Sequence, residues 1–202
     1  MARLTREQSQ ALTRSKLLVS AAEVVAREGY EGASIDRITD AAGFSKGAFY
    51  SNFVNKEELF LELLENHAGQ DVVQLRQLLA GVADPQEVIN RIVTWADERA
   101  SDPTWGLLPL ELFRRARRDA TFGNRHATLF LSQWKGVGEM LLPYMHKTPK
   151  VDPAVVGGIV LELTYGAASG FSNGKGPSVG NLVRLALESL FMAYESGRLE
   201  TA

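Results

Sequence analysis

The chain has 202 residues, of which 45% are hydrophobic and 23% charged, and its formal net charge is −2. This length and composition allow one large or two small globular domains, and the charge balance excludes a uniformly basic, histone-like protein while permitting a local positive face. The absence of cysteine excludes disulfides, thiolate catalysis and cysteine-ligated zinc. The polar N-terminus and the lack of an apolar run of about 18 residues predict a soluble cytoplasmic protein with no membrane segment.

Three helices are predicted in the first quarter of the chain. Apolar residues recur at helical spacing over residues 13–28, and Gly29 is expected to end this helix. The residues upstream are also compatible with a helix, so they either extend this one or lie loose. Ser34 is expected to cap a second helix that Gly43 closes, and Ser45 to cap a third helix over residues 45–53.

Longer helices are predicted in the remaining chain. Asn55 and Glu58 are typical of a capping box that opens the fourth helix, and Asp84 is expected to cap the fifth. Pro109 predicts a kink or a delayed start in the region that follows residue 103. The other helices are predicted, in chain order, over residues 55–79, 84–100, 120–146, 155–171 and 179–196.

These elements predict an all-α fold with about nine helices, because no strand pair, repeat or low-complexity tract is present. We expect a three-helix unit over residues 1–54, followed by a larger helical domain over residues 55–202.

Only Gly43, Phe44 and Ser45 separate the second and third helices. A three-residue turn containing glycine, between two short helices, is typical of a helix-turn-helix. Helices below about 12 residues are marginal alone, so an apolar inner face must hold them. The expected inner face comprises Ile35, Ile38, Ala42, Phe49 and Phe53, packed against Leu18, Ala22 and Val25. The turn alone does not decide the function, since similar geometry occurs in proteins that do not bind DNA.

The outer face of the third helix has a composition that suits a DNA groove. Lys46, Gly47 and Tyr50 share this face because they are three and four residues apart. The lysine offers a cation to a base edge or phosphate, the glycine lets the backbone approach closely, and the tyrosine hydroxyl suits a phosphate. Ala48 is suited to contact a thymine methyl group.

Three further positions are suited to phosphate. Ser34 and Ser45 lie at helix N-termini, where free N–H groups favour an anion. Lys56 lies in the first turn of the fourth helix, where a cation opposes the helix dipole, so we expect an external anion to compensate it. The N-terminal arginines, Arg3 and Arg6, either reach a minor groove or form a solvated terminus.

Residues 13–60 resemble the tetracycline-repressor-like (TetR) family of transcriptional regulators. The matching features are the EGY end of the first helix, residues 28–30, then AGFSKGAFYSNF, residues 42–53, and KEEL, residues 56–59. Phe44 replaces the commoner valine, and Asn52 stands where histidine or tyrosine is frequent. Both departures affect base preference or phosphate geometry and leave the resemblance intact.

The resemblance implies a homodimer whose paired third helices enter successive major grooves of a palindromic operator in double-stranded DNA. It also implies C-terminal helices that form a dimer interface and a pocket for a small molecule. The implied phosphate contacts are Ser34, Thr39, Ser45, Tyr50, Asn52 and Lys56, with Lys46, Gly47 and Ala48 nearest the bases.

The C-terminal part carries weaker signals. Its last two helices combine apolar and small residues, which suit either an intrachain core or a four-helix bundle with a second copy. Glu111 and Glu162 either attract a cationic ligand or lie on an exposed edge. The candidate pocket residues, which are equally compatible with plain core, are Trp95, Trp105, Leu108, Glu111, Leu112, Phe122, Phe130, Trp134, Met140 and Tyr165.

No catalytic or metal constellation is predicted. His67, His126 and His146 lie too far apart in sequence for a helix-spaced metal pair, and no phosphate-binding loop or nucleophile–base pair is evident, so we expect no cofactor and no enzyme. The sequence therefore predicts a dimeric repressor that responds to a small molecule. The alternative is a helical small-molecule-binding or architectural protein with non-specific DNA contact.

Overall fold

The computed structural model describes residues 5–101, 104–145, 151–170 and 176–195. Within these ranges the chain forms helices and no strands, which confirms the all-α prediction. The helices are α1 (Arg6–Gly32), α2 (Ile35–Ala42), α3 (Lys46–Tyr50), α4 (Lys56–Leu79), α5 (Pro85–Ala100), α6 (Thr104–Ala116), α7 (Ala120–Leu141), the 3₁₀ turn Leu142–Tyr144, α8 (Pro153–Gly170) and α9 (Val179–Glu195).

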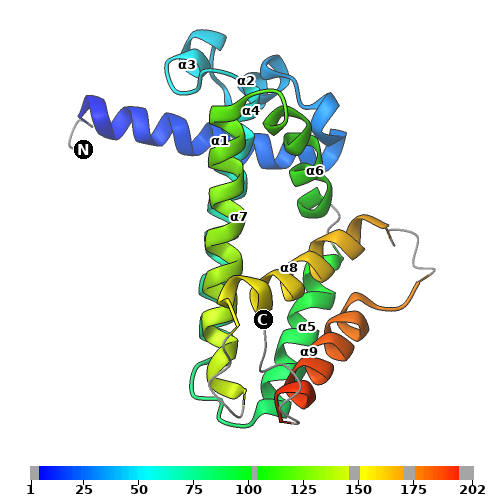
Figure 1. Ribbon diagram of the computed structural model, residues 1–202. Coiled ribbons are helices and arrows are strands. Elements are labelled where there is room, and N and C mark those ends of the chain that lie inside the picture. The colour runs from blue at the N-terminus through cyan, green and yellow to red at the C-terminus, as the bar shows by residue number, and fades with distance from the viewer. Residues whose placement is uncertain (1–4, 102–103, 146–150, 171–175, 196–202) are drawn as a thin grey trace.

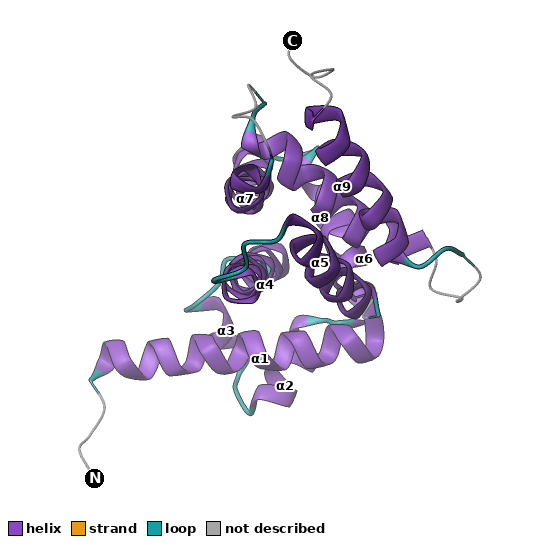
Figure 2. Cartoon of the chain, turned by 90° about the horizontal axis from the view of Figure 1, so that it is seen from below, coloured by secondary structure: helices purple, strands orange, loops and turns teal. Residues whose placement is uncertain are grey.

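The short helices α2 and α3 lie at one end of the molecule, and α5 and α9 lie at the other (Figure 1). The long helices α4 and α7 run side by side between the two ends, and both appear end-on from below (Figure 2). The first half of α1 projects away from the rest of the chain. No helix among the described residues is long and apolar enough to cross a membrane.

Two hydrophobic cores stabilise the fold, and α4 contributes to both. The head core joins α1, α2 and α3 to the first half of α4 and to α6, while the body core joins α5, α7, α8 and α9 to the second half of α4. Leu59 and Phe60 are buried in the head core, and Leu75 and Leu79 in the body core. One continuous helix therefore connects the two parts.

Helix α1 is longer than its apolar pattern alone indicates. It begins at Arg6 because Thr5 caps it, with Thr5 and Gln8 each accepting from the backbone N–H of the other. The upstream residues thus extend the helix. At Gly29 the chain breaks helical geometry, with φ 70° and ψ 174°, and then adds a short turn to Gly32. A left-handed value of φ is accessible to glycine without steric cost, which explains this residue at the break.

The predicted caps of the short helices are confirmed, but α3 is shorter than predicted. The side chains of Ser34 and Ser45 cap α2 and α3, and Gly43 closes α2 in the left-handed conformation. Helix α3 ends at Tyr50 instead of residue 53. The side chains of Ser51 and Asn52 both donate to the carbonyl of Ala48, at 2.9 and 2.8 Å, and so compete with the continuing helix for that acceptor.

Several other boundaries differ from the predicted ones. Asn55 caps α4 as predicted, because its side chain accepts from the N–H of Glu58. The expected capping box is not complete, because the Glu58 carboxylate accepts from the N–H of Val54, at 2.6 Å, instead of from that of Asn55. Helix α6 starts before Pro109, so the delayed start is wrong. Helix α7 ends at Leu141 instead of residue 146, and the chain tightens into a 3₁₀ turn that contains proline.

Candidate nucleic-acid interface and internal pocket

The inner side of α3 is held by buried aromatic rings. Phe49 and Phe53 are buried in the head core, with ring centroids 5.6 Å apart. On α1, Val25 is buried in this core as predicted. Leu17 and Ala21 are fully buried, whereas their predicted neighbours in sequence, Leu18 and Ala22, are only partly buried. This core fixes which side of α3 faces solvent.

The outer side of α3 is open, as the spacing of its residues predicts. Tyr50 is 58% exposed and the Lys46 side chain is 62% exposed. A Cβ added at Gly47 would meet only the Ser45 hydroxyl, at 3.6 Å. The three residues therefore form an accessible surface, which we call the α3 face.

Some of the other residues predicted to contact DNA lie next to the α3 face. The Nζ of Lys46 pairs with Asp36 Oδ1 at 2.6 Å, and because both side chains are exposed, this pair is weak and readily exchanged for a phosphate. Ser34 and Ser45 are exposed and accept cap hydrogen bonds, which leaves their O–H groups available to donate. Ala48 is half-buried beside them.

Thr39 and Lys56 lie away from the α3 face. Thr39 is 2% exposed, and its hydroxyl donates to the carbonyls of Ile35 and Asp36 at 2.9 and 3.0 Å. The ammonium of Lys56 donates to the backbone carbonyl of Tyr30 at 2.6 Å, and its Nζ lies 4.0 Å from the centre of the Tyr30 ring. Burial lowers the pKa of the Lys56 ammonium. In the free chain, Lys56 therefore contacts the carbonyl and ring of Tyr30, and its contact with a phosphate stays a prediction.

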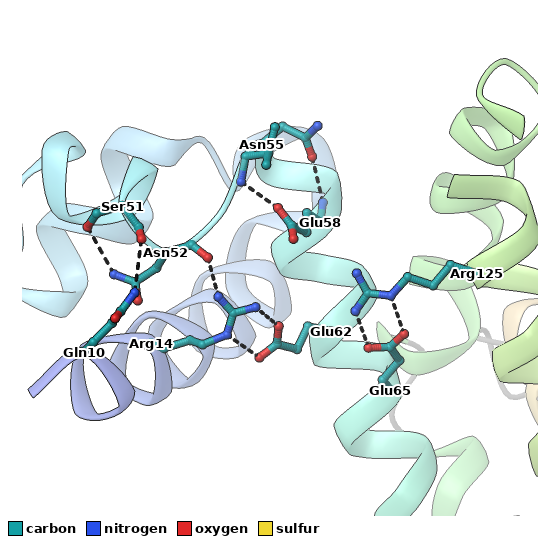
Figure 3. Close-up of polar contacts among 10 residues, drawn as sticks. Gln10, Arg14, Ser51, Asn52, Asn55, Glu58, Glu62, Glu65 and Arg125 are labelled. Carbon is teal, nitrogen blue, oxygen red and sulfur yellow. Dashed lines mark hydrogen bonds and ion pairs between the residues drawn. The ribbon is translucent and has the colours of Figure 1, made fainter. Parts of the chain in front are cut away.

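Asn52 ties the end of α3 to the first and fourth helices (Figure 3). Its backbone carbonyl accepts a hydrogen bond from the guanidinium of Arg14. The same guanidinium forms a bidentate ion pair with Glu62 and lies 4.1 Å from the centre of the Phe53 ring. Gln10 adds a longer bond to the Ser51 carbonyl, at 3.4 Å. The sequence offered no local signal for this cluster, because Arg14 and Glu62 are 48 residues apart.

A second ion pair connects α4 to α7. Arg125 donates to both carboxylate oxygens of Glu65, at 2.7 and 2.5 Å, and Figure 3 shows the pair one turn along α4 from the Arg14–Glu62 contact. Helix α4 is therefore fixed on one side to the head and on another to a wall of the body.

An internal pocket of about 510 Å³ lies between α4, α6, α7 and α8. This volume is within the range of about 300–1,000 Å³ that suits small molecules. Four of the predicted candidates line it: Trp105, Phe130, Trp134 and Tyr165. The remaining candidates lie outside its lining: Trp95 and Met140 pack in the body core, Leu108, Leu112 and Phe122 pack in the head core, and Glu111 lines a separate polar cleft.

One wall of the pocket carries a polar cluster that the sequence analysis missed. Asp71 is buried and pairs with Arg99 at 2.7 Å, and the Tyr165 hydroxyl donates to the same carboxylate. His67 stacks on Trp105 with ring centroids 3.7 Å apart, and its Nε2 is 3.6 Å from Asp71. Burial raises the pKa of both Asp71 and Tyr165. The i, i+4 spacing of His67 and Asp71 on an inward helix face was the available signal.

Comparison with known proteins identifies the head. Residues 17–63 match the family model described as bacterial regulatory proteins, tetR family. The transcriptional activator FasR of Mycolicibacterium smegmatis is 38% identical over 80 residues, covering 40% of this chain and 36% of FasR. The transcriptional repressor AcnR of Corynebacterium diphtheriae is 30% identical over 117 residues, covering 56% of this chain and 55% of AcnR. Both matches span less than two thirds of the relative.

Solved structures share the whole fold. The fatty acid degradation regulator FadR of Bacillus halodurans has a TM-score of 0.67 at 16% identity, covering 94% of this chain and 97% of its own. FadR of Bacillus subtilis, solved with stearoyl-CoA, has a TM-score of 0.60 at 18% identity, covering 88% and 97%. A protein from Saccharomonospora viridis, solved with choline, has a TM-score of 0.65 at 17% identity, covering 90% and 96%.

The family model covers the three-helix head, the curated relatives are regulators of transcription, and the solved structures have the same helical arrangement. The head of the chain, residues 17–63, therefore matches the tetR family of bacterial regulatory proteins, and the chain shares its helical fold with solved regulators.

Proposed function

We propose that the chain is a repressor that binds a palindromic operator as a homodimer and releases it when a small molecule enters the pocket. The observation that carries this proposal is the α3 face: Lys46, Gly47 and Tyr50 are exposed together on a helix whose other side is locked by Phe49 and Phe53. The division into a DNA-binding unit over residues 1–54 and a ligand-binding and dimerisation domain over residues 55–202 belongs to the same proposal.

A second copy is supported by apolar side chains on the last two helices. Val155 on α8 and Leu185 and Met192 on α9 are exposed although α8 and α9 pack against each other. Exposed apolar side chains on two packed helices favour a partner surface. A two-fold pair of heads suits a palindrome whose half-sites are about 34–36 Å apart, one turn of the duplex.

Helix α4 supports the link between the pocket and DNA. Its first turns carry Glu62, which holds the end of α3 through Arg14, and its later turns carry His67 and Asp71 at the pocket. Suppose that a pocket occupant binds more tightly to a conformation in which α4 is tilted differently from the DNA-binding conformation. The occupant then lowers operator affinity by the ratio of its own affinities for the two conformations. Two structural neighbours carry small molecules, stearoyl-CoA and choline, in their own structures.

The test of the DNA-binding surface uses duplexes that the wild-type protein selects from a random pool. Tyr50→Ala and Lys46→Ala are each expected to weaken binding about tenfold, because a lost base or phosphate contact costs about 1–3 kcal/mol. Binding is titrated at fixed salt, and Lys46→Ala is also expected to reduce the salt dependence.

The matched control is Lys135→Ala on α7, which likewise removes an exposed cation paired with an acid four residues away. It is expected to leave DNA affinity unchanged. Wild-type affinity in both head variants, with the fold intact, would contradict the assigned surface. Competition with bulk DNA separates the alternative, since a regulator prefers its selected site by a factor of about 10³ or more.

A further inference from the structure

His126 is a buried polar residue that structural packing does not account for. It lines the pocket, is 8% exposed, and has Phe130, Phe113 and Phe122 around it, with ring centroids at 4.7, 6.3 and 6.5 Å. Nothing in the described part of the chain hydrogen-bonds its Nε2. A buried polar atom without a partner costs about 1–3 kcal/mol, so this nitrogen requires an explanation that the aromatic contacts do not give.

The Nε2 atom is an acceptor. Burial lowers the pKa of His126, so the ring is neutral at neutral pH, and the Pro109 backbone opposes this shift only in part. Proline has no N–H, so its backbone can only accept a hydrogen bond, and the ring nitrogen that faces it carries the proton. Because Nε2 has no partner, that nitrogen is Nδ1, which leaves the Nε2 lone pair without a donor on a side chain that lines the pocket.

The charges around the pocket do not favour an ionic occupant. The Asp71 carboxylate is already engaged by Arg99 and by the Tyr165 hydroxyl, so a cation would have to displace them. Among the described lining residues there is no lysine or arginine to receive an anion. Glu162 is the remaining acid of the lining, and it is exposed to solvent.

We propose that the pocket binds an uncharged, aromatic and hydroxylated molecule, of the phenol class, whose O–H donates to Nε2 of His126 while its ring packs against Phe113 and Phe130, which line the pocket. This inference rests on the proposed function in one respect, which is that the bound molecule is the effector that releases DNA. Binding of the molecule to the pocket does not depend on DNA. It names the chemistry of the occupant, which the fold alone leaves open.

The experiment compares two neutral probes that differ in the hydroxyl group. 1-Naphthol and 1-methoxynaphthalene are titrated into the full chain at neutral pH by calorimetry, with choline and decanoate as charged probes. We expect 1-naphthol to bind about tenfold more tightly than the ether, because the ether cannot donate and leaves Nε2 without a partner. Choline and decanoate are expected to bind more weakly than 1-naphthol.

Two variants assign the preference to His126. His126→Phe is expected to abolish the difference between the probes while still binding the ether, which shows that the pocket is intact. His126→Gln, which offers a carbonyl acceptor, is expected to restore part of the preference.

Four outcomes would overturn the proposal: equal affinity for the two neutral probes, no binding of either, an unchanged preference in His126→Phe, or tighter binding of choline that Glu162→Gln removes. Release of the selected DNA by 1-naphthol is measured separately. If 1-naphthol binds more tightly than the ether but does not release the DNA, the effector role is contradicted while the inference about binding still holds.

Discussion

At the scale of single residues, Gly47 separates the requirements of folding from those of DNA binding. It lies inside α3, where glycine costs about 1 kcal/mol relative to alanine, and a Cβ there meets no close neighbour except Ser45 Oγ at 3.6 Å. Neither packing nor backbone geometry in the free chain requires glycine. The remaining reason for it is the space that it leaves on the α3 face.

Gly47→Ala is therefore expected to stabilise the chain slightly, by up to about 1 kcal/mol, and to weaken binding to the selected duplex several-fold. Gly69→Ala is the matched control, because a Cβ added at this exposed α4 glycine would meet no atom within 4 Å. Both variants are compared by urea unfolding and by DNA titration. Unchanged DNA affinity in Gly47→Ala would show that the backbone of α3 does not approach the duplex closely.

At the scale of helices, Arg14 holds three elements together. One guanidinium bonds the Asn52 carbonyl after α3, pairs with Glu62 on α4, and covers the Phe53 ring, while its own backbone belongs to α1. Glu62 is partly buried in this contact. Removal of the Arg14 guanidinium leaves the half-buried Glu62 carboxylate and the Asn52 carbonyl without a hydrogen-bond donor. The resulting loss of stability is larger than that from breaking an exposed ion pair.

Arg14→Met, which keeps an apolar stem near Phe53, is expected to lower the free energy of unfolding by about 2 kcal/mol. Arg27→Met is the control: it removes an arginine from the same helix, where the pair with Glu28 is exposed on the arginine side, and should cost less than about 1 kcal/mol. Urea unfolding monitored by tryptophan fluorescence measures both. Similar losses in the two variants would mean that Arg14 does not hold the three helices together.

The sequence predicted those parts of the fold that depend on neighbouring residues. Ser34, Gly43 and Asp84 specify helix ends through bonds to residues two to four positions away, and all three ends are where they were predicted. The spacing of Lys46, Gly47 and Tyr50 likewise placed them on one exposed side of α3.

Predictions that depended on distant contacts were less successful. The hydrogen bond of Lys56 to the carbonyl of Tyr30, 26 residues away, was not foreseen, while its contact with an external anion stays a prediction. The polar wall of the pocket joins His67 to Tyr165 across 98 residues. Trp95 is aromatic and faces inward like Trp134, yet only the latter lines the pocket, because helix packing decides which inward face meets a cavity.

At the scale of the whole molecule, the exposed apolar side chains of α8 and α9 are the surface on which we propose that a second copy packs. Leu185 is 66% exposed, and Val155 and Met192 are also exposed. In the single chain these side chains remain in water, whereas a two-fold partner would bury them together.

Leu185→Glu is expected to produce monomers at concentrations where the wild type is a dimer, since a buried, unpaired carboxylate costs several kcal/mol. Affinity for a palindromic duplex should fall more than tenfold, because the two heads no longer bind as one unit. Val73→Glu, which places the same charge at an exposed apolar residue of α4, should change neither property. Light scattering after size exclusion measures the mass, and a dimer in Leu185→Glu would place the interface elsewhere.

The continuity of α4 has a geometric consequence. Its 24 residues, Lys56–Leu79, make a rod roughly 36 Å long at about 1.5 Å per residue. Rotation of such a rod by about 5° around its Leu79 end displaces the Asn55 end by about 3 Å, and two copies moving in opposite senses change their separation by about 6 Å. In the proposed dimer, that change is about a sixth of the helical repeat of about 34–36 Å, so the two α3 helices would no longer match successive major grooves.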